Sequence, residues 1–347
     1  MFLLIDFGLM LVGCSIVLVN RSKWFQWINI LFGLFATLYY IYLAFVVICR
    51  PNTTFWGSLE NWSFIIGNTM TRLLFISKRT KLRLLLKQIK SMADISTSRF
   101  LKRLEMLMVF LYLMSLTIAI NYTLVTVSDP IALKSTSEWF WFWLDRITFR
   151  HQMAFATLMW YKAMVRDQWM KVTILVYVYI AIALEKLANQ QISRWLPIKT
   201  LKNMQTCLIT KHQNLSMKEQ FVDIVKLLPL NWLVWIFLGT SSVIVESSGL
   251  QLWYMIDIIE HLVIVFGAIF FINYHRDQNR SLCQLVIRNF VNQSSLDKYS
   301  NIEYIKSELM SDVEYTAFGL FNLNNGLLLS FMSGLITFTV MFIQLHI

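Results

Sequence analysis

Apolar segments of about 20 residues recur along the whole of this 347-residue chain, and they limit its possible folds more than any other feature. As an α-helix, each segment is long enough to cross a hydrocarbon core of about 30 Å. Hydrophobic residues make up 57% of the chain and charged residues only 15%, which is far from the composition of soluble domains. The sequence therefore predicts an all-α, polytopic membrane protein.

Seven membrane crossings are predicted. Six of them are single apolar segments: 24–49, 60–77, 104–127, 228–246, 252–274 and 325–346. The seventh belongs to a long helical stretch at 147–193, which at ~1.5 Å per residue would be about 70 Å long. Less than half of that length can be embedded in a membrane. We expect the remainder to project into the cytoplasm and to pack against other helices.

The positions of Lys and Arg indicate which connections are cytoplasmic. Region 78–103 contains nine basic residues and Asp94 as its only acidic residue, and region 194–226 is also basic. Cytoplasmic connections of membrane proteins carry such an excess of basic residues. The connections expected on the other side contain at most one basic residue each: 50–59, 128–138 and 247–251. Seven crossings then place the amino terminus in the cytoplasm and the carboxyl terminus outside.

These crossings divide the chain into segments. The predicted organisation is an amino-terminal membrane-associated segment at 1–23, helices 1 to 4 at 24–193, a cytoplasmic helical loop at 194–227, helices 5 and 6 at 228–274, a cytoplasmic segment at 275–324 and a last helix at 325–347. The first segment contains Asp6 and has no basic residues before it, so it does not fit a cleaved signal peptide. We expect a short helix that lies in or on the membrane.

Several functional classes find no support in the sequence. The net charge of +11 could suggest a nucleic-acid partner, but the basic residues lie between apolar segments and no binding module accompanies them. The four cysteines are widely scattered and the five histidines form no pair at metal-ligand spacing. No nucleophile elbow or complete kinase signature is present. We therefore expect no enzyme activity, no cofactor, no metal site and no nucleic-acid partner.

One glycosylation pattern fits the predicted orientation. Asn52-Thr53-Thr54 is an acceptor sequence on a connection expected outside. The same pattern also begins at Asn20, Asn214 and Asn292, which the orientation places inside. The match at Asn52 is therefore only mild support.

The last apolar segment carries polar residues on one side. Ser330, Ser333, Thr337 and Gln344 are spaced by three, four and seven residues, and Val340 fills the gap, so all five fall on one stripe of a helix. Within a membrane, polar side chains meet a partner helix, water or their own backbone. Two interpretations stay open: the hydroxyls bond to their own helix while Gln344 reaches the headgroups, or several copies turn the stripe toward a shared pore.

Residues 337–345, Thr-Phe-Thr-Val-Met-Phe-Ile-Gln-Leu, resemble the terminal signature of insect gustatory receptors, which is usually Thr-Tyr, five apolar residues and Gln-Phe. The spacing is kept, but Phe338 stands where tyrosine is usual and Leu345 where phenylalanine is usual. The resemblance extends over the whole chain in its length, its basic first inner region, its long fourth helix and the sequence GLFNLNN before the last helix.

This resemblance implies a homotetrameric, ligand-gated, nonselective cation channel that depolarises a taste neuron, in the plasma membrane of its dendrite. It implies a pore lined by the last helix, with Gln344 and Leu345 at the gate, and an anchor made of the cytoplasmic extensions of helices 4 to 7. The implied partners are a small-molecule tastant, membrane lipids, and copies of the chain or related receptor subunits. The alternatives are an insect odorant receptor-type channel and a G-protein-coupled receptor, whose orientation would be opposite.

The implied ligand pocket lies in the outer half of the bundle formed by helices 1 to 6. Our candidate ligand-binding residues are Trp62, Asn68, Trp235, Trp253, Tyr254, Asp257 and His261. Most aromatic residues in the spans are expected to serve in packing or at the membrane interface. Asp257, Glu260 and His261 are more selective indicators, because ionisable groups within a membrane usually face protein or water. An internal pairing of these groups with Arg72 or Arg146 is the alternative.

Overall fold

Helices make up nearly all of the part of the chain that the computed structural model describes. The described residues are 6, 9–10, 13–16, 22–49, 55–128, 169–196, 201–246, 252–293 and 299–346. Some sequence predictions lie outside the described residues: Asn20, Asn52, Arg146 and the part of the fourth helix before residue 169.

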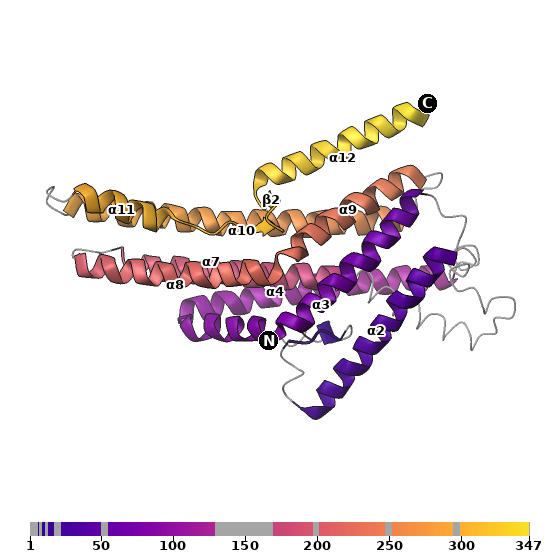
Figure 1. The fold of residues 1–347 in the computed structure, drawn as a ribbon, viewed down its shortest axis with the longest axis horizontal. Helices are drawn as coiled ribbons and strands as arrows, with labels where there is room; N and C mark the ends of the chain where they lie inside the picture. Colours follow the sequence, from indigo (N-terminus) through magenta and orange to yellow (C-terminus); the bar gives the residue numbers. More distant parts are fainter. Residues whose placement is uncertain are drawn as a thin grey trace.

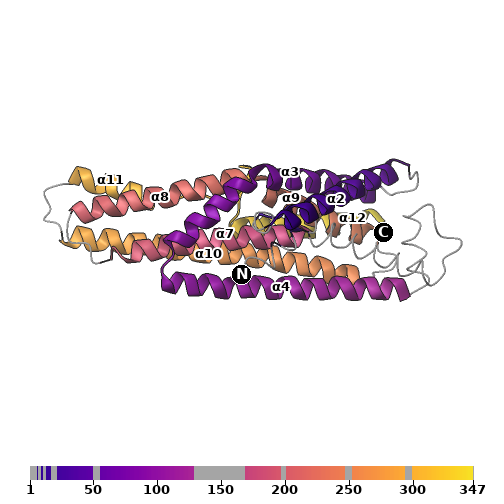
Figure 2. The same cartoon turned by 90° about the horizontal axis from the view of Figure 1, so that it is seen from below.

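Nine helices lie within the described ranges, and the longer ones run side by side along one axis (Figures 1 and 2). They are α2 (Lys23–Cys49), α3 (Phe55–Met92), α4 (Ile95–Ser128), α7 (Trp169–Ser193), α8 (Leu201–Val225), α9 (Leu227–Glu246), α10 (Leu252–Gln293), α11 (Tyr299–Met310) and α12 (Asn325–His346). Each of the six single apolar segments lies within one of these helices. A helix is the form in which such a segment satisfies its own backbone hydrogen bonds.

A small hairpin is the exception to the predicted all-α fold. Strands β1 (Thr316–Ala317) and β2 (Phe321–Asn322) pair antiparallel between α11 and α12. At the tip, Phe318 and Gly319 have φ angles of 55° and 75°, a left-handed conformation that glycine adopts readily. The sequence analysis did not predict this hairpin, because two-residue strands leave no periodic pattern.

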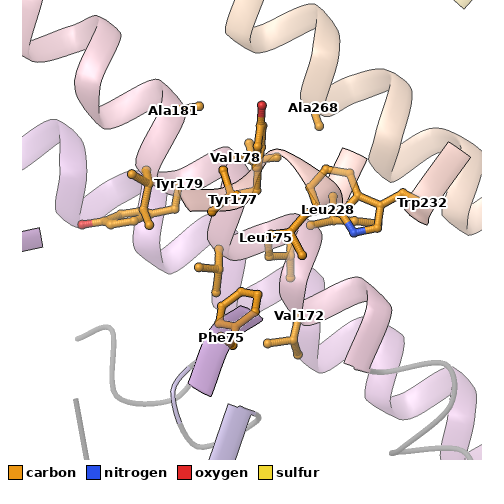
Figure 3. Packing of buried hydrophobic residues seen from close by; sticks show 14 of the residues in the cluster. Phe75, Val172, Leu175, Tyr177, Val178, Tyr179, Ala181, Leu228, Trp232 and Ala268 are labelled. Atoms are coloured by element: carbon orange, nitrogen blue, oxygen red, sulfur yellow. The ribbon is translucent and has the colours of Figure 1, made fainter. Parts of the chain in front are cut away.

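Helix α7 lies at the centre of the protein. It contacts α3, α4, α8, α9 and α10, and 23 of its 25 residues are buried. Figure 3 shows how Val172, Leu175 and Tyr177 of α7 meet Phe75 of α3 and Trp232 of α9 in the main hydrophobic core. A helix that is apolar on all sides is expected to be surrounded by protein, and α7 satisfies this condition over its described length.

The basic region 78–103 is almost entirely helical, contrary to the expected loop. Helix α3 continues to Met92, and after two residues α4 begins at Ile95. Asp94 caps α4, because its carboxylate accepts a hydrogen bond from the backbone N–H of Thr97 at 2.8 Å. The buried residues of the extension follow helical spacing: Leu82, Leu85, Leu86 and Ile89. This apolar stripe explains why the helix continues through a charged sequence.

A second, smaller hydrophobic cluster lies at the end of the molecule where α8, α10 and α11 run together (Figure 1). Its buried members are Ile192, Met204, Cys207, Cys283, Val286, Phe290, Ile305 and Leu309. Helix α10 runs without a break through the predicted boundary at residue 274 to reach this cluster. Regions 194–227 and 275–324 thus contribute helices to one small bundle, and the role of this bundle as an anchor stays a prediction.

The described residues near the amino terminus are buried against α2. The Asp6 carboxylate accepts hydrogen bonds from Ser15 Oγ at 2.7 Å and from the backbone N–H of Ile16 at 2.6 Å. Asn29 of α2 accepts a hydrogen bond from the Ser15 N–H at 2.9 Å and donates one to the Gly13 carbonyl at 3.1 Å. In the described part of the expected membrane-associated segment, residues 6, 9 and 10 are helical, and residues 13–16 form a turn fixed to α2.

Replacing Gly13 by alanine is expected to destabilise the protein by at least about 2 kcal/mol. Gly13 has a φ of 79°, and a Cβ atom there would meet the backbone nitrogen of Gly33 at 2.7 Å. Gly267→Ala is the control, because a Cβ atom at that position of α10 meets nothing within 4 Å. Thermal melting of the detergent-solubilised chain measures both effects. Equal melting temperatures for the two variants would contradict this account of the turn.

Length and composition alone identify fewer crossings than the seven predicted. Within the described ranges, Lys23–Phe45 and Trp169–Ser193 are long and apolar enough to span a membrane. Asn203–Val225 and Leu227–Leu238 meet at a bend of 48° and raise the number to three if they form one span, and Asn325–Phe338 is a shorter apolar helix. The number and direction of the crossings remain predictions.

Candidate functional site

Helix α12 contacts its own protomer along one narrow face. The rings of Phe331 and Phe338 lie 6.2 and 5.9 Å from that of Phe237 on α9, and Phe331 lies 6.3 Å from Phe266 on α10. Among the described side chains of α12, Leu335 alone is buried, at 6% exposure. In Figure 1, α12 extends away from the other helices toward the carboxyl terminus.

The predicted polar stripe lies on the other side of α12. All five of its residues are exposed: Ser330, Ser333, Thr337, Val340 and Gln344. With 3.6 residues per helical turn, the middle of this stripe falls about half a turn around the helix from Leu335. The stripe is therefore accessible to water or to another chain.

Phe338 and Leu345 are the two residues that differ from the gustatory receptor signature, and the structure describes the side chain of Phe338 only. Phe338 packs on Phe237, so its ring takes part in holding α12 against α9. Leu345 lies within α12, but its side chain is outside the described residues. The neighbouring Gln344 is exposed.

Two of the predicted ligand-binding residues meet between α9 and α10. The ring centroids of Trp235 and His261 are 4.3 Å apart, with an angle of 60° between the rings. Trp235 is 7% exposed and His261 is 0% exposed. The sequence analysis predicted both residues for one pocket, and the structure brings them into contact.

Asn68 lies at the same level on α3. Asn231 of α9 donates a hydrogen bond to Thr71 Oγ1 at 3.1 Å, and α3 and α9 run in opposite directions (Figure 1). Asn68 and Trp235 are each about one turn beyond this hydrogen bond, in the same direction. Within the described part of the chain, the buried Asn68 amide and the Trp235 indole N–H have no hydrogen-bond partner. Leaving such groups unsatisfied costs about 1–3 kcal/mol each, so they are suitable partners for a polar ligand.

A buried ion pair joins α7 and α10 next to this group. Lys171 Nζ lies 2.8 Å from Glu260 Oε2, and the two side chains are 2% and 15% exposed. The sequence analysis named Glu260 but missed Lys171 as its partner, because 89 residues separate them. Arg72, one of the partners considered for the acids, donates to the Gly33 carbonyl of α2 at 2.8 Å and lies over the Tyr40 ring.

The other predicted ligand-binding residues do not belong to the described Trp235 and His261 contact. Trp62 of α3 is half-buried, whereas the side chains of Trp253, Tyr254 and Asp257 lie outside the described residues. Trp232, another aromatic residue of this region, donates a hydrogen bond to Thr173 Oγ1 at 3.1 Å and serves in packing. No three His, Cys, Asp or Glu side chains of the described ranges lie together in a way that could hold a metal ion.

Comparison with known proteins gives a match in structure alone. No protein-family model matches the chain, and no curated protein matches it in sequence. The structure of the insect olfactory receptor OR5 from Machilis hrabei in complex with eugenol matches with a TM-score of 0.67 and 12% sequence identity, covering 98% of this chain and 97% of that receptor chain. The structure of the same receptor without eugenol matches with a TM-score of 0.66, 14% identity and the same coverage.

The match extends over nearly the full length of both chains, so it includes both α12 and the bundle that carries Trp235 and His261. The matched protein is a receptor and not an enzyme, which agrees with the lack of any catalytic pattern in the sequence. The chain has the all-helical, multi-pass fold of an insect olfactory receptor.

Proposed function

We propose that the chain is an insect chemoreceptor of the gustatory type, and that four copies form a ligand-gated, nonselective cation channel in the plasma membrane. The observation that carries this proposal is the polar stripe on α12, which is exposed opposite the side that packs on α9 and α10. The likeness of fold to an insect olfactory receptor and the terminal motif at 337–345 support it.

The stripe suits a pore because its polar groups require partners within a membrane. Ser330, Ser333 and Thr337 offer hydroxyl groups that lipid tails cannot hydrogen-bond, whereas a water-filled channel or a neighbouring copy can. Copies arranged around a symmetry axis would turn the same residues toward one conduit. The amide of Gln344 would then belong to a ring near the outer mouth.

Cysteine accessibility tests the pore directly. Ser333→Cys and Thr337→Cys are expected to react with a water-soluble, positively charged thiol reagent, and the reaction should block most of the whole-cell cation current. Ile336→Cys is the control, because Ile336 is exposed on α12 but lies beside the stripe. Block at Ile336 with none at the two stripe positions would exclude this orientation of α12.

A small molecule with an aromatic or apolar body and a polar group is the ligand class that suits the Trp235 and His261 contact. The two rings offer stacking surfaces, and the indole N–H and the Asn68 amide offer hydrogen bonds. Eugenol, to which the olfactory receptor OR5 is bound in its structure, has this character and is a reasonable first probe.

Trp235→Ala is expected to weaken the response to such a ligand by about tenfold or more in half-maximal concentration, because a buried aromatic contact contributes more than 1.4 kcal/mol. The unliganded current should stay unchanged. Dose–response recordings measure both quantities. Trp27→Ala is the control, since Trp27 of α2 is 69% exposed. An equal shift in both variants would remove Trp235 from the ligand site.

An odorant receptor-type channel is the second candidate, because the solved structures with the same fold are those of an olfactory receptor. Recording from cells that express this chain alone, with a panel of volatile and nonvolatile ligands, separates the two. Currents evoked by soluble tastants without a second subunit favour the gustatory function. A response only to volatile ligands and only with a partner subunit favours the odorant function.

A further inference from the structure

The connection between α11 and α12 determines where the last helix begins. Residues 311–324 contain the β1–β2 hairpin and lead directly into α12. Helix α12 packs on its own protomer through a few aromatic and aliphatic side chains, and the connector joins it covalently to the preceding helices. A shift of the connector would therefore be passed on to α12.

Backbone and amide hydrogen bonds hold the hairpin end of the connector. The Phe318 N–H donates to the carbonyl of Lys226, at the junction of α8 and α9, at 2.8 Å. Asn273 of α10 donates through Nδ2 to the Leu323 carbonyl at 3.1 Å. The junction of α8 and α9 and one residue of α10 thus hold the connector shortly before α12 begins.

Buried charges hold the other end of the connector. Lys218 of α8 lies between two carboxylates: its Nζ atom is 2.6 Å from Glu185 Oε1 of α7 and 3.0 Å from Asp312 Oδ1 of the connector. Arg276 of α10 contacts the same Asp312 through Nε at 2.8 Å. The side chains of Lys218 and Glu185 are 1% and 0% exposed, and those of Asp312 and Arg276 are 13% and 12% exposed.

Neutral groups complete the bonding of Glu185. Tyr315 of the connector donates its hydroxyl to Glu185 Oε1 at 3.0 Å, and Asn279 of α10 donates to Oε2 at 3.2 Å. The two carboxylate oxygens together have partners from α8, α10 and the connector. The connector residues Asp312 and Tyr315 take part in a network that joins α7, α8 and α10.

The pKa values of Asp312 and Lys218 are shifted so that both groups stay charged at neutral pH. Burial raises the pKa of Asp312, but Lys218 and Arg276 outweigh burial and hold it below its ordinary value. Burial lowers the pKa of Lys218, but Glu185 and Asp312 outweigh it and raise the value. Because the pKa of Asp312 is lowered, its contribution to folding stability is present above its unfolded pKa and is lost as the pH falls through the folded pKa. Because the pKa of Lys218 is raised, its contribution is present below its unfolded pKa and is lost as the pH rises through the folded pKa.

Helix α10 also carries His261 of the candidate ligand site, and α7 lies next to that site through Lys171. Helices α7 and α10 run in the same direction, because Lys171 meets Glu260 near their starts and Glu185 meets Asn279 further along both. His261, which directly follows Glu260 on α10, contacts Trp235 of α9. A ligand that shifts α7 relative to α10 near Lys171 and Glu260 would also change distances near Glu185 and Asn279, where the connector is held.

We propose that Glu185, Lys218, Asp312 and Arg276 form a latch that fixes the connector 311–324, and that this latch sets the balance between closed and open arrangements of α12. The proposal rests on the proposed channel function and adds the residues that couple its ligand site to its pore. Buried ion pairs often add little net stability compared with apolar residues of the same size. A role in selecting one arrangement therefore accounts for the network better than a role in stability alone.

The test removes the charges without changing side-chain volume much. Glu185→Gln combined with Lys218→Met leaves no uncompensated charge between these two residues and keeps hydrogen-bonding groups for Tyr315 and Asn279. Asp312→Asn is a second, independent variant on the connector. Lys226→Met is the control, because the exposed Lys226 side chain, directly after α8, forms its ion pair with Asp223. The backbone carbonyl of Lys226, which holds the connector, is kept in this variant.

Unliganded open probability, single-channel conductance and surface labelling are measured for each variant in the full chain. The latch variants are expected to raise the unliganded open probability by about tenfold, because removing a latch that fixes the connector in the closed arrangement favours the open arrangement. Conductance and the control should match the wild type. A merely structural network would lower surface labelling and leave the open probability of each channel unchanged.

The outcomes separate the two proposals. Wild-type open probability in both latch variants, at any level of surface labelling that allows recording, overturns the latch and leaves the channel function standing. No current from the wild-type chain or any variant, with normal surface labelling, overturns the channel function and the latch together. If the double variant does not reach the surface, Asp312→Asn decides the question.

Discussion

Replacing Thr337 by lysine is expected to reduce the cation current by about a hundredfold or more without reducing the number of chains at the surface. Thr337 lies in the middle of the exposed stripe of α12. In the proposed tetramer, four ammonium groups would face the same water-filled path, and their combined potential would repel permeating cations. Whole-cell recording with surface biotinylation measures current and chain number in the same cells.

Thr337→Asp is the matched control. Lysine and aspartate cost similar amounts at the centre of a membrane helix, about 2.5–3.5 kcal/mol on insertion scales, so both variants carry the same penalty for membrane insertion. Only the sign of the charge differs, and a ring of carboxylates favours cations. Equal loss of current in the two variants would mean that residue 337 acts through folding and not through the permeation path.

Replacing Lys171 by methionine is expected to destabilise the protein by about 3–5 kcal/mol, because the variant leaves a buried carboxylate without its ammonium partner. Glu260 is 15% exposed and has its oxygen 2.8 Å from Lys171 Nζ. Thermal melting in detergent measures the effect. Adding Glu260→Gln to Lys171→Met should restore most of the lost stability, because the unpaired charge is then gone.

This double substitution also separates stability from ligand response. If the pair only holds α7 and α10 together, the double variant should regain a normal response to ligand along with its stability. If Glu260 also contacts ligand through its exposed part, the response should stay reduced at restored stability. A double variant that melts as low as Lys171→Met would contradict the assignment of the pair as mutual partners.

The helices could be predicted from the sequence because long apolar runs admit few structures in a membrane. The limits of α2, α9 and α12 agree with the predicted segments to within one or two residues. The polar stripe of α12 could be predicted from spacing alone, and all five of its residues are exposed in the protomer. Trp235 and His261 could be selected because aromatic and ionisable residues within a span are few enough to notice.

Other features depend on contacts that no local pattern records. The pairing of Lys171 with Glu260 joins residues 89 positions apart, and the docking of Asp6 requires a turn whose partners lie on α2. The latch had one usable signal: Lys211, Asn214 and Lys218 interrupt an otherwise apolar stripe of α8, and all three are buried. Buried lysines require carboxylates, but the sequence does not say which ones.

The narrow attachment of α12 has a consequence for how the sequence of this chain can diverge. Few residues of its own protomer restrict the sequence of 325–346, apart from those that meet Phe237, Phe266 and the main core. Substitutions on the exposed side are therefore tolerated or rejected according to the neighbouring copies and not the surrounding bundle. In the proposed channel, conductance properties can therefore change while ligand preference is inherited intact, and chimaeras exchanged at the hairpin should inherit each trait from a different parent.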